Sequence, residues 1–348
     1  MIRIRIVALT ATVAAFTAVA LIAQADPKHT AGKMQVAAEK FVASLTPELK
    51  TKASFGYDDK HRVKWFFTPQ QDKEKKFTRK GARLEEMTAE QKTASLNLLK
   101  TGLSAKGYET ASAIMGLEAT LAELEGTKGA MTRNTGWYFV SVFGEPSATG
   151  KWGWRFEGHH LSVNYTLDKG EVVSATPLLF ASNPAEVKDG DKKGLRPLPG
   201  IEDHARALIK SLTAEQDKIA KQTMPEKLEA LEIKEGYANA GVGDPVGIPV
   251  AKLTEKQQDT LRALELAYLE RMPDDLAAAE KKNTDAPTDK VQFAYWGSPE
   301  VGKPYAYRVY APKFVIEFLN VQADAAKNPA NHIHSAWRRL PADFGLAE

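Results

Sequence analysis

The 348-residue chain contains no cysteine. This absence excludes disulfide bonds, thiolate nucleophiles and covalent haem attachment through cysteine. Any metal ion must therefore be held by histidine, carboxylate or amide side chains. The sequence also lacks a Gly-x-Ser-x-Gly elbow, a phosphate-binding loop, a His-Glu-x-x-His pair and a dinucleotide-binding glycine fingerprint. The hydrolases, metalloproteases and nucleotide-binding proteins that depend on these motifs are excluded.

The N-terminus has the pattern of a cleavable secretory signal peptide, residues 1–25. Arg3 and Arg5 precede an apolar run over residues 6–22, and Ala23-Gln24-Ala25 is the small-x-small pattern that signal peptidase cuts after. An uncleaved membrane anchor is the rival interpretation. The run is rich in Ala and Thr rather than Leu, which favours cleavage. We expect a periplasmic or secreted mature protein, residues 26–348, without a stable membrane span.

The chain also has little excess charge of either sign. It carries 47 Lys and Arg against 44 Asp and Glu, and loss of the two basic residues in the predicted signal peptide leaves 45 against 44. A nearly neutral protein has no general attraction for nucleic acid or for an anionic membrane. No Lys/Arg cluster lies on a recognisable nucleic-acid motif. We therefore expect no nucleic-acid partner, and the sequence does not predict an oligomeric state.

Four segments repeat one helix-start pattern, a threonine N-cap followed by an acid or a proline in the first turn. These threonines are Thr46, Thr88, Thr213 and Thr254. After the last three, a glutamine at the third helical position completes a capping box. Thr46 and Thr213 are 167 residues apart, and Thr88 and Thr254 are 166 apart. The nearly equal spacings suggest that the chain repeats itself.

Further matches continue this series at an offset of 153 residues. The segment 143–146 (Phe-Gly-Glu-Pro) corresponds to 296–299 (Trp-Gly-Ser-Pro), and Trp154-Arg155 corresponds to Tyr307-Arg308. A second copy shorter by about 13 residues accounts for the change of offset, since residues 117–126 have no full counterpart. The ordered series predicts an internal duplication with halves of about 33–195 and 200–348, both within a single domain, 26–348.

Each half is predicted to run helix, helix, strand, strand. Segments rich in aromatic and β-branched residues predict the strands, with Gly/Pro-containing turns between them. These segments are Gly136–Phe143, Trp152–Phe156, Leu161–Leu167, Gln292–Trp296, Tyr305–Tyr310 and Phe314–Leu319. We expect an α+β fold in which strands of both halves form a shared, mainly antiparallel sheet or barrel, with helices packed outside.

The histidines are concentrated in two short runs, His159-His160 and His332-x-His334. On an extended strand, His332 and His334 project from one face, and His160 lies opposite His159. If the halves meet symmetrically, His160 and Glu317 reach the same pocket. Three imidazoles and a carboxylate suit a divalent zinc, iron, manganese or copper ion. The sequence leaves two alternatives open, a hydrogen-bonded polar core and a pocket for a non-metal ligand.

Four further residues are predicted to support the metal ligands: His159, Asn164, Glu157 and Arg155. Two arginines, Arg308 and Arg338, are candidate catalytic residues that bind an anionic group of a small-molecule substrate. The alternative for the arginines is structural, with Arg155 or Arg308 paired with Glu157 or Glu317 inside the sheet. The six tryptophans either line a ligand cleft or belong to the core.

Several stretches resemble a known family of exported bacterial proteins, the domain of unknown function 3500. The most specific is the run 152–162, Trp-Gly-Trp-Arg-Phe-Glu-Gly-His-His-Leu-Ser, and the run 332–338, His-Ile-His-Ser-Ala-Trp-Arg, adds to it. Asn134 and Phe344 depart from the family pattern, which has Asp and Tyr there. The resemblance implies a periplasmic or secreted protein in which the histidine runs are family hallmarks. It supplies no activity.

These observations lead to two functional hypotheses. The first is an exported metal-dependent enzyme, either a hydrolase or an oxygenase-type oxidoreductase, because a bound metal can activate water or use open positions for O₂. The second is a non-catalytic periplasmic ligand-binding or envelope-associated protein. In that protein the tryptophans would form the cleft and the histidines would be structural.

Overall fold

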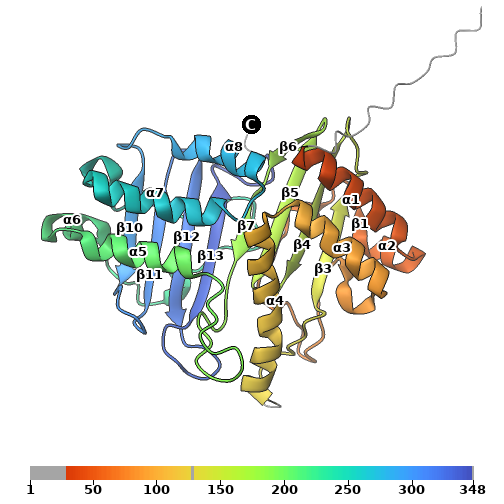
Figure 1. Cartoon of the computed structure of the whole chain (residues 1–348), viewed down its shortest axis with the longest axis horizontal. Coiled ribbons are helices and arrows are strands. Elements are labelled where there is room, and N and C mark those ends of the chain that lie inside the picture. Colours follow the sequence, from red (N-terminus) through yellow and green to blue (C-terminus); the bar gives the residue numbers. More distant parts are fainter. Residues whose placement is uncertain (1–28, 127–128, 347–348) are drawn as a thin grey trace, which may run out of the picture.

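The computed structural model describes residues 29–126 and 129–346, so the predicted signal peptide lies outside the described residues. Within them the chain forms eight α-helices on one large sheet (Figure 1). The helices are α1 (Thr30–Ser44), α2 (Pro47–Ala53), α3 (Ala89–Thr101), α4 (Ala105–Glu125), α5 (Pro199–Ser211), α6 (Ala214–Ala220), α7 (Glu255–Leu269) and α8 (Asp274–Thr284). None of these helices has the length and apolar character needed to span a bilayer.

The sheet contains thirteen strands, most of them antiparallel. They are β1 (Ser54–Phe55), β2 (Ala82–Arg83), β3 (Tyr138–Phe143), β4 (Lys151–Gly158), β5 (Leu161–Asp168), β6 (Glu171–Ser174), β7 (Leu178–Phe180), β8 (Lys221–Gln222), β9 (Ile248–Pro249), β10 (Gln292–Gly297), β11 (Tyr305–Tyr310), β12 (Phe314–Gln322) and β13 (His332–Arg339). The spatial order is β1-β3-β4-β5-β7-β13-β12-β11-β10-β8, with β2, β6 and β9 as side branches. The predicted α+β class is confirmed.

The barrel alternative is wrong, because the sheet is open. Strands β1 and β8 stand at its two ends, and no pairing between them is present in the described residues. The middle of the sheet is the antiparallel pair β7–β13, in which Leu178 lies opposite Trp337 and Leu179 opposite Ala336. This pair joins the strands of residues 138–180 to those of residues 292–339, so both parts of the chain share one sheet, as predicted.

The predicted helix starts and strands are also present. Thr88, Thr213 and Thr254 each form the predicted capping box, and Thr46 caps α2 through its side chain. The capping glutamines also tie helices together, since Gln91 donates to the carbonyl of Ser44 at 2.8 Å. All six predicted strands are present. Their ends differ from the predicted bounds by two residues or fewer, except that β12 continues three residues further, to Gln322.

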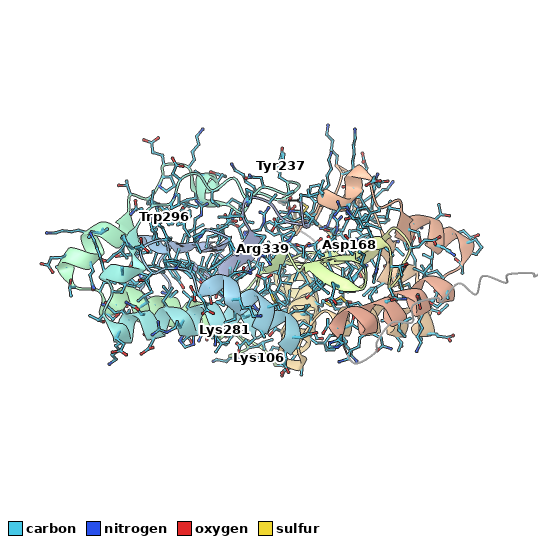
Figure 2. All side chains as sticks on the ribbon, turned by 90° about the horizontal axis from the view of Figure 1, so that it is seen from above. Lys106, Asp168, Tyr237, Lys281, Trp296 and Arg339 are labelled. Carbon is cyan, nitrogen blue, oxygen red and sulfur yellow. The ribbon has the colours of Figure 1, made fainter. Side chains whose placement is uncertain are left out.

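The two faces of the sheet have different covers. The helices pack on one face, α1 and α3 over β3–β5 and α5 and α7 over β10–β13 (Figure 1). The irregular segments around residues 57–80 and 223–247 cover the other face. Figure 2 shows Tyr237 of the second segment on the side of the sheet opposite Lys281 and Lys106. We call this second face the loop face.

Each face carries its own hydrophobic core. The larger core lies under the helices, and a smaller one on the loop face includes Trp65, Phe67 and Val315. Five of the six tryptophans are buried: Trp65, Trp152, Trp154, Trp296 and Trp337. These five therefore belong to the cores, which is one of the two alternatives considered for the tryptophans.

Candidate metal centre

Three histidines from two distant parts of the chain meet near the middle of the sheet, where β4 turns into β5 and β13 begins. His160 lies in the turn between β4 and β5, whereas His332 and His334 lie at the start of β13. One ring nitrogen from each residue falls within 4.8 Å of the other two. The Nε2 atom of His332 is 3.0 Å from that of His160 and 3.0 Å from that of His334. The sequence prediction brought these three residues together correctly.

The backbone turn places His160, and a bulge places His332. His160 has φ +64, in the left-handed region, and its amide donates to the carbonyl of Phe67 at 2.8 Å. The register of β12 and β13 shifts where Gln322 rather than Val321 lies opposite His332, and such bulges re-aim a side chain at the end of a strand. His334 follows in regular register, and Ile333 between them is buried in the larger core under the helices.

A carboxylate fixes the tautomer of His334. Its Nδ1 lies 2.7 Å from a carboxylate oxygen of Glu232, in the loop-face segment. A carboxylate only accepts at neutral pH, so Nδ1 carries the hydrogen and the Nε2 lone pair points toward the other two rings. Carboxylate–histidine pairs of this kind orient the ring and raise its basicity in metal sites. Sequence reasoning missed Glu232, because no local pattern connects it with a strand 100 residues later.

The cluster is largely withdrawn from water, which favours the neutral form of His160 and His332. His160 and His334 are buried, and His332 is partly exposed. Burial, followed by the neighbouring histidines, lowers the pKa of His160 and of His332 well below the usual value. A neutral imidazole is the form that binds metals.

His159 contacts His160 of the cluster, but from a turn rather than from the predicted strand. It shares the β4–β5 turn with His160, and the two rings are tilted against each other with centroids 3.7 Å apart. Its Nδ1 contacts the Glu118 carboxylate of α4 and lies 3.3 Å from Nη1 of Arg133. Burial, only partly offset by Glu118, lowers the pKa of His159. Because these residues sit in a turn, the strand alternation used to separate them does not apply.

A sequence model of the family described as protein of unknown function (DUF3500) matches residues 27–346. The chain belongs to this family. No curated protein and no solved structure matches it. The family membership indicated by the two histidine runs is therefore confirmed. Those runs supply all three members of the cluster. Because the family description names no activity, the function of this DUF3500 protein has to be argued from its own side chains.

The predicted fourth ligand, Glu317, is outside the cluster. It lies on the loop face with its carboxylate 3.5 Å from Arg308 and 4.0 Å from Arg338. Burial raises the pKa of Glu317, and the two arginines only partly offset this rise. The predicted substrate-binding arginines are thus brought together with Glu317 rather than with the histidines.

Arg308 and Arg338 hold the loop-face segments to the sheet. Arg338 is fully buried, donates to Asp343 at 2.5 Å, and reaches the carbonyls of Lys234 and Tyr237. Arg308 lies 3.5 Å from the carbonyl of Leu231. These contacts match the structural alternative considered for the arginines.

The remaining predicted supporting residues play the same structural part in the other half of the sheet. Arg155 donates to the carbonyls of His61 and Lys64, and lies 3.4 Å from Glu157. Burial tends to raise the pKa of Glu157, but Arg155 and Arg79 outweigh it and keep the pKa below the usual value. Asn164 donates to Ser162 and to the carbonyl of Pro177. The contacts of all three lie within the sheet and its loop-face cover.

Proposed function

We propose that this DUF3500 protein is an exported metal-dependent hydrolase whose metal is held by Nε2 of His160, His332 and His334. The observation that carries the proposal is the pair of 3.0 Å contacts that His332 Nε2 makes to the other two Nε2 atoms. A neutral ring has a single N–H, so a hydrogen on His332 Nε2 satisfies only one of the two contacts. A cation attracts all three lone pairs at once.

Two of the three separations between the ring nitrogens suit a first-row ion, and the third is within 4.8 Å. Nitrogen ligands at about 2.0–2.1 Å, with angles between octahedral and tetrahedral values, lie about 2.9–3.4 Å apart. The two 3.0 Å separations fall in this range. An all-imidazole donor set favours zinc, iron or copper, whereas manganese prefers oxygen ligands.

The donor set also favours hydrolysis over oxygenation. Three histidines leave a fourth position for water, and no ligand carboxylate reduces the charge of the ion, so the pKa of a bound water falls toward about 7. Non-haem iron oxygenases typically use two histidines and one carboxylate. Glu317, which would have supplied that carboxylate, is paired with two arginines instead. We infer a small-molecule substrate with a hydrolysable bond; a metal held by the three histidines would polarise that bond and activate water.

The experiment compares metal-free and zinc-loaded protein, purified without a histidine tag, on chromogenic carboxylic and phosphoric esters. Turnover that requires the metal and is lost in His334→Ala supports the hydrolase. Stoichiometric metal without turnover of any ester, combined with tight binding of a small molecule, would contradict it in favour of a non-catalytic periplasmic binding protein.

Replacing Glu232 by glutamine is expected to weaken metal binding by roughly 10–100-fold, the usual effect of losing an outer-shell carboxylate. An amide can still accept a hydrogen bond, but it lacks the charge that favours the Nε2 lone pair of His334. Competition titration against a chelator of known affinity measures the change. Glu229→Gln, on the same loop-face segment, is the matched control and should leave the affinity unchanged. Equal affinities for wild type and Glu232→Gln would show that Glu232 does not orient the ligand.

Export and duplication complete the proposal. The signal-peptide pattern supports a mature N-terminus at Asp26, which N-terminal sequencing of the exported protein tests directly. Two observations support the duplication. The strands β3-β4-β5-β7 and β10-β11-β12-β13 follow one another across the sheet in the same sequence order in each half. The contact of Gln91 with the carbonyl of Ser44 is matched by that of Gln257 with the carbonyl of Ser211. The counterpart of His160 at the 153-residue offset is Lys313, so the second half would hold no equivalent metal site.

A further inference from the structure

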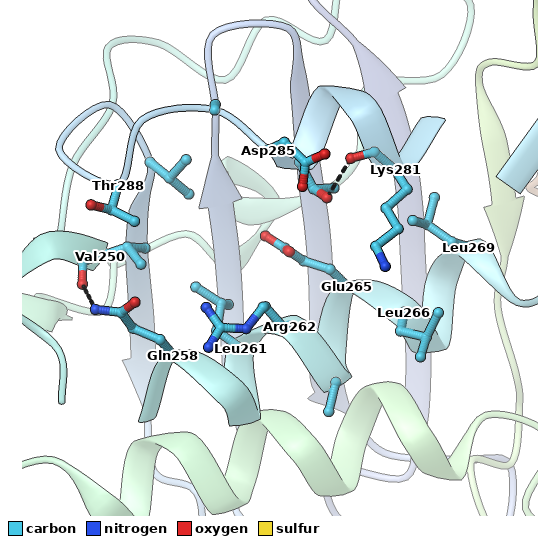
Figure 3. Close-up of a pocket in the computed structure, with 14 residues that line it drawn as sticks. Val250, Gln258, Leu261, Arg262, Glu265, Leu266, Leu269, Lys281, Asp285 and Thr288 are labelled. Carbon is cyan, nitrogen blue, oxygen red and sulfur yellow. Dashed lines mark hydrogen bonds between the residues drawn. The ribbon is translucent and has the colours of Figure 1, made fainter. Parts of the chain in front are cut away.

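A cavity of about 540 Å³ lies between α7 and α8, on the helix side of the sheet (Figure 3). This is within the size range of small-molecule sites. Its walls are mostly apolar and include Leu261, Leu269 and Val291. None of its lining residues belongs to the histidine cluster, so the cavity is separate from the proposed metal site.

A carboxyl group without a partner points into this cavity. Glu265 projects from α7 between the apolar walls, as Figure 3 shows, and its side chain is buried, with 7% of the residue exposed. In the part of the chain that the structure describes, it forms no hydrogen bond and no ion pair. Burial, with a smaller contribution from Asp285, raises the pKa of Glu265 to about 8, although Arg262 opposes this. An unpaired buried carboxyl is costly, so its presence calls for an explanation.

The fold does not need an acid at this position. Helices α3 and α7 begin with the same capping box, and both pack on the helix side of the sheet. Glu265 is 11 residues after the N-cap Thr254, and Leu99 is 11 residues after the N-cap Thr88. Leu99 is fully buried in the apolar core. At this position α3 therefore has a leucine that packs in the core, whereas α7 has an acid that faces a cavity.

We propose that this cavity binds a small organic cation, a protonated amine carried on an apolar body. Glu265 would hold the ammonium group inside the cavity and the exposed Asp285 would approach it from the rim. Leu261, Leu269 and Val291 would pack against the apolar part. The two basic residues at the cavity, Arg262 and Lys281, are exposed, and Arg262 is paired with Asp259 at 2.5 Å. They stand at the rim, so the buried acid is left for the ligand. A primary amine supplies the positive charge and the hydrogen-bond donors that the Glu265 carboxyl lacks.

Isothermal titration with hexylamine, hexanol and hexanoate tests the chemical class. Hexylamine should bind the full-length wild-type protein, and hexanol at least tenfold more weakly. Glu265→Gln should lose at least tenfold in hexylamine affinity, and Asp285→Asn should lose less. Glu255→Gln, an exposed change on the same helix, is the matched control and should bind as wild type. Three results would overturn the proposal. The first is that hexanoate binds as tightly as hexylamine, and the second is that Glu265→Gln keeps the full hexylamine affinity. The third is that hexylamine does not bind at about 10 mM, a concentration at which weak fragments are detected.

Thermal unfolding separates loss of the site from loss of the fold. The pKa of Glu265 is higher in the folded chain than in the unfolded chain, so the folded protein holds the extra proton between about pH 4.5 and pH 8. The stability that this proton contributes is present below about pH 4.5 and is lost as the pH rises through about 8. The groups facing Glu265 are Arg262, Lys281 and Asp285.

Glu265→Gln is accordingly expected to unfold at nearly the wild-type temperature at pH 5, and at a higher temperature than wild type at pH 8.5. Glu265→Leu should behave in the same way, since Leu99 shows that leucine suits the equivalent helix position. A temperature difference that is the same at both pH values would mean that Glu265 already has a partner, and it would overturn the proposal with the titration.

Discussion

His334→Ala and His160→Ala are each expected to reduce the bound metal from one ion per chain to a trace after dialysis. Each change removes one of three nitrogen ligands and leaves a pair of imidazoles. The affinity should fall by more than the roughly 10–100-fold that loss of an outer-shell partner costs. Elemental analysis of protein purified without a histidine tag measures the metal content. His332→Ala should give the same result, because its Nε2 contacts both of the others.

The control for these variants is His204→Ala, since His204 lies on α5 and outside the cluster. It should retain the wild-type metal content. Circular dichroism must show that the alanine variants stay folded, because the histidines also contact neighbours such as Phe67, whose ring centroid is 4.9 Å from that of His334. If the His160→Ala and His334→Ala proteins are folded and keep a full metal content, the histidines are not the metal ligands. The histidines would then form a hydrogen-bonded polar core.

Arg338→Met is expected to destabilise the protein by about 3–5 kcal/mol, the usual effect of removing one partner of a buried ion pair. The guanidinium is fully buried and bonds Asp343 and the carbonyls of Lys234 and Tyr237, and Glu317 lies 4.0 Å away. Methionine fills a similar volume but leaves these acceptors without their donors. Equilibrium unfolding in urea, followed by tryptophan fluorescence, measures the loss.

Two further variants make this prediction specific. Lys210→Met removes an exposed lysine 3.2 Å from Glu300 and should change stability by no more than about 1 kcal/mol. The double variant Arg338→Met/Asp343→Asn should recover part of the loss, because the stranded carboxylate is then neutral. If Arg338 instead bound a substrate anion, Arg338→Met would leave stability unchanged and weaken substrate binding. That result would restore the catalytic role predicted from the sequence.

The elements predictable from the sequence are those set by local rules. A threonine N-cap and a glutamine three residues later satisfy backbone groups within one helical turn, so Thr88, Thr213 and Thr254 mark helix starts whatever their tertiary surroundings. The strands are equally predictable, because aromatic and β-branched residues fit a sheet that is packed on both faces. The openness of the sheet was not predictable, since it depends on which strands stand at the two ends.

The candidate site was predictable only in part. His332 and His334 are two apart on one strand, so strand alternation placed them together correctly. The same rule misplaced His159 and His160, which belong to a turn with His160 in the left-handed region. Glu232 and Glu118 reach the histidines from an irregular segment and from a helix. Such contacts depend on how segments fold over the sheet, and no spacing in the sequence encodes them.

The central claim is that three imidazoles bind one metal ion. X-ray absorption at the metal edge of the zinc-reconstituted protein, prepared without a histidine tag, tests it most directly. The account predicts one zinc per chain, with three imidazole nitrogens at about 2.0–2.1 Å and a light-atom ligand in the remaining position. A coordination shell dominated by oxygen, with one imidazole or none, would contradict it.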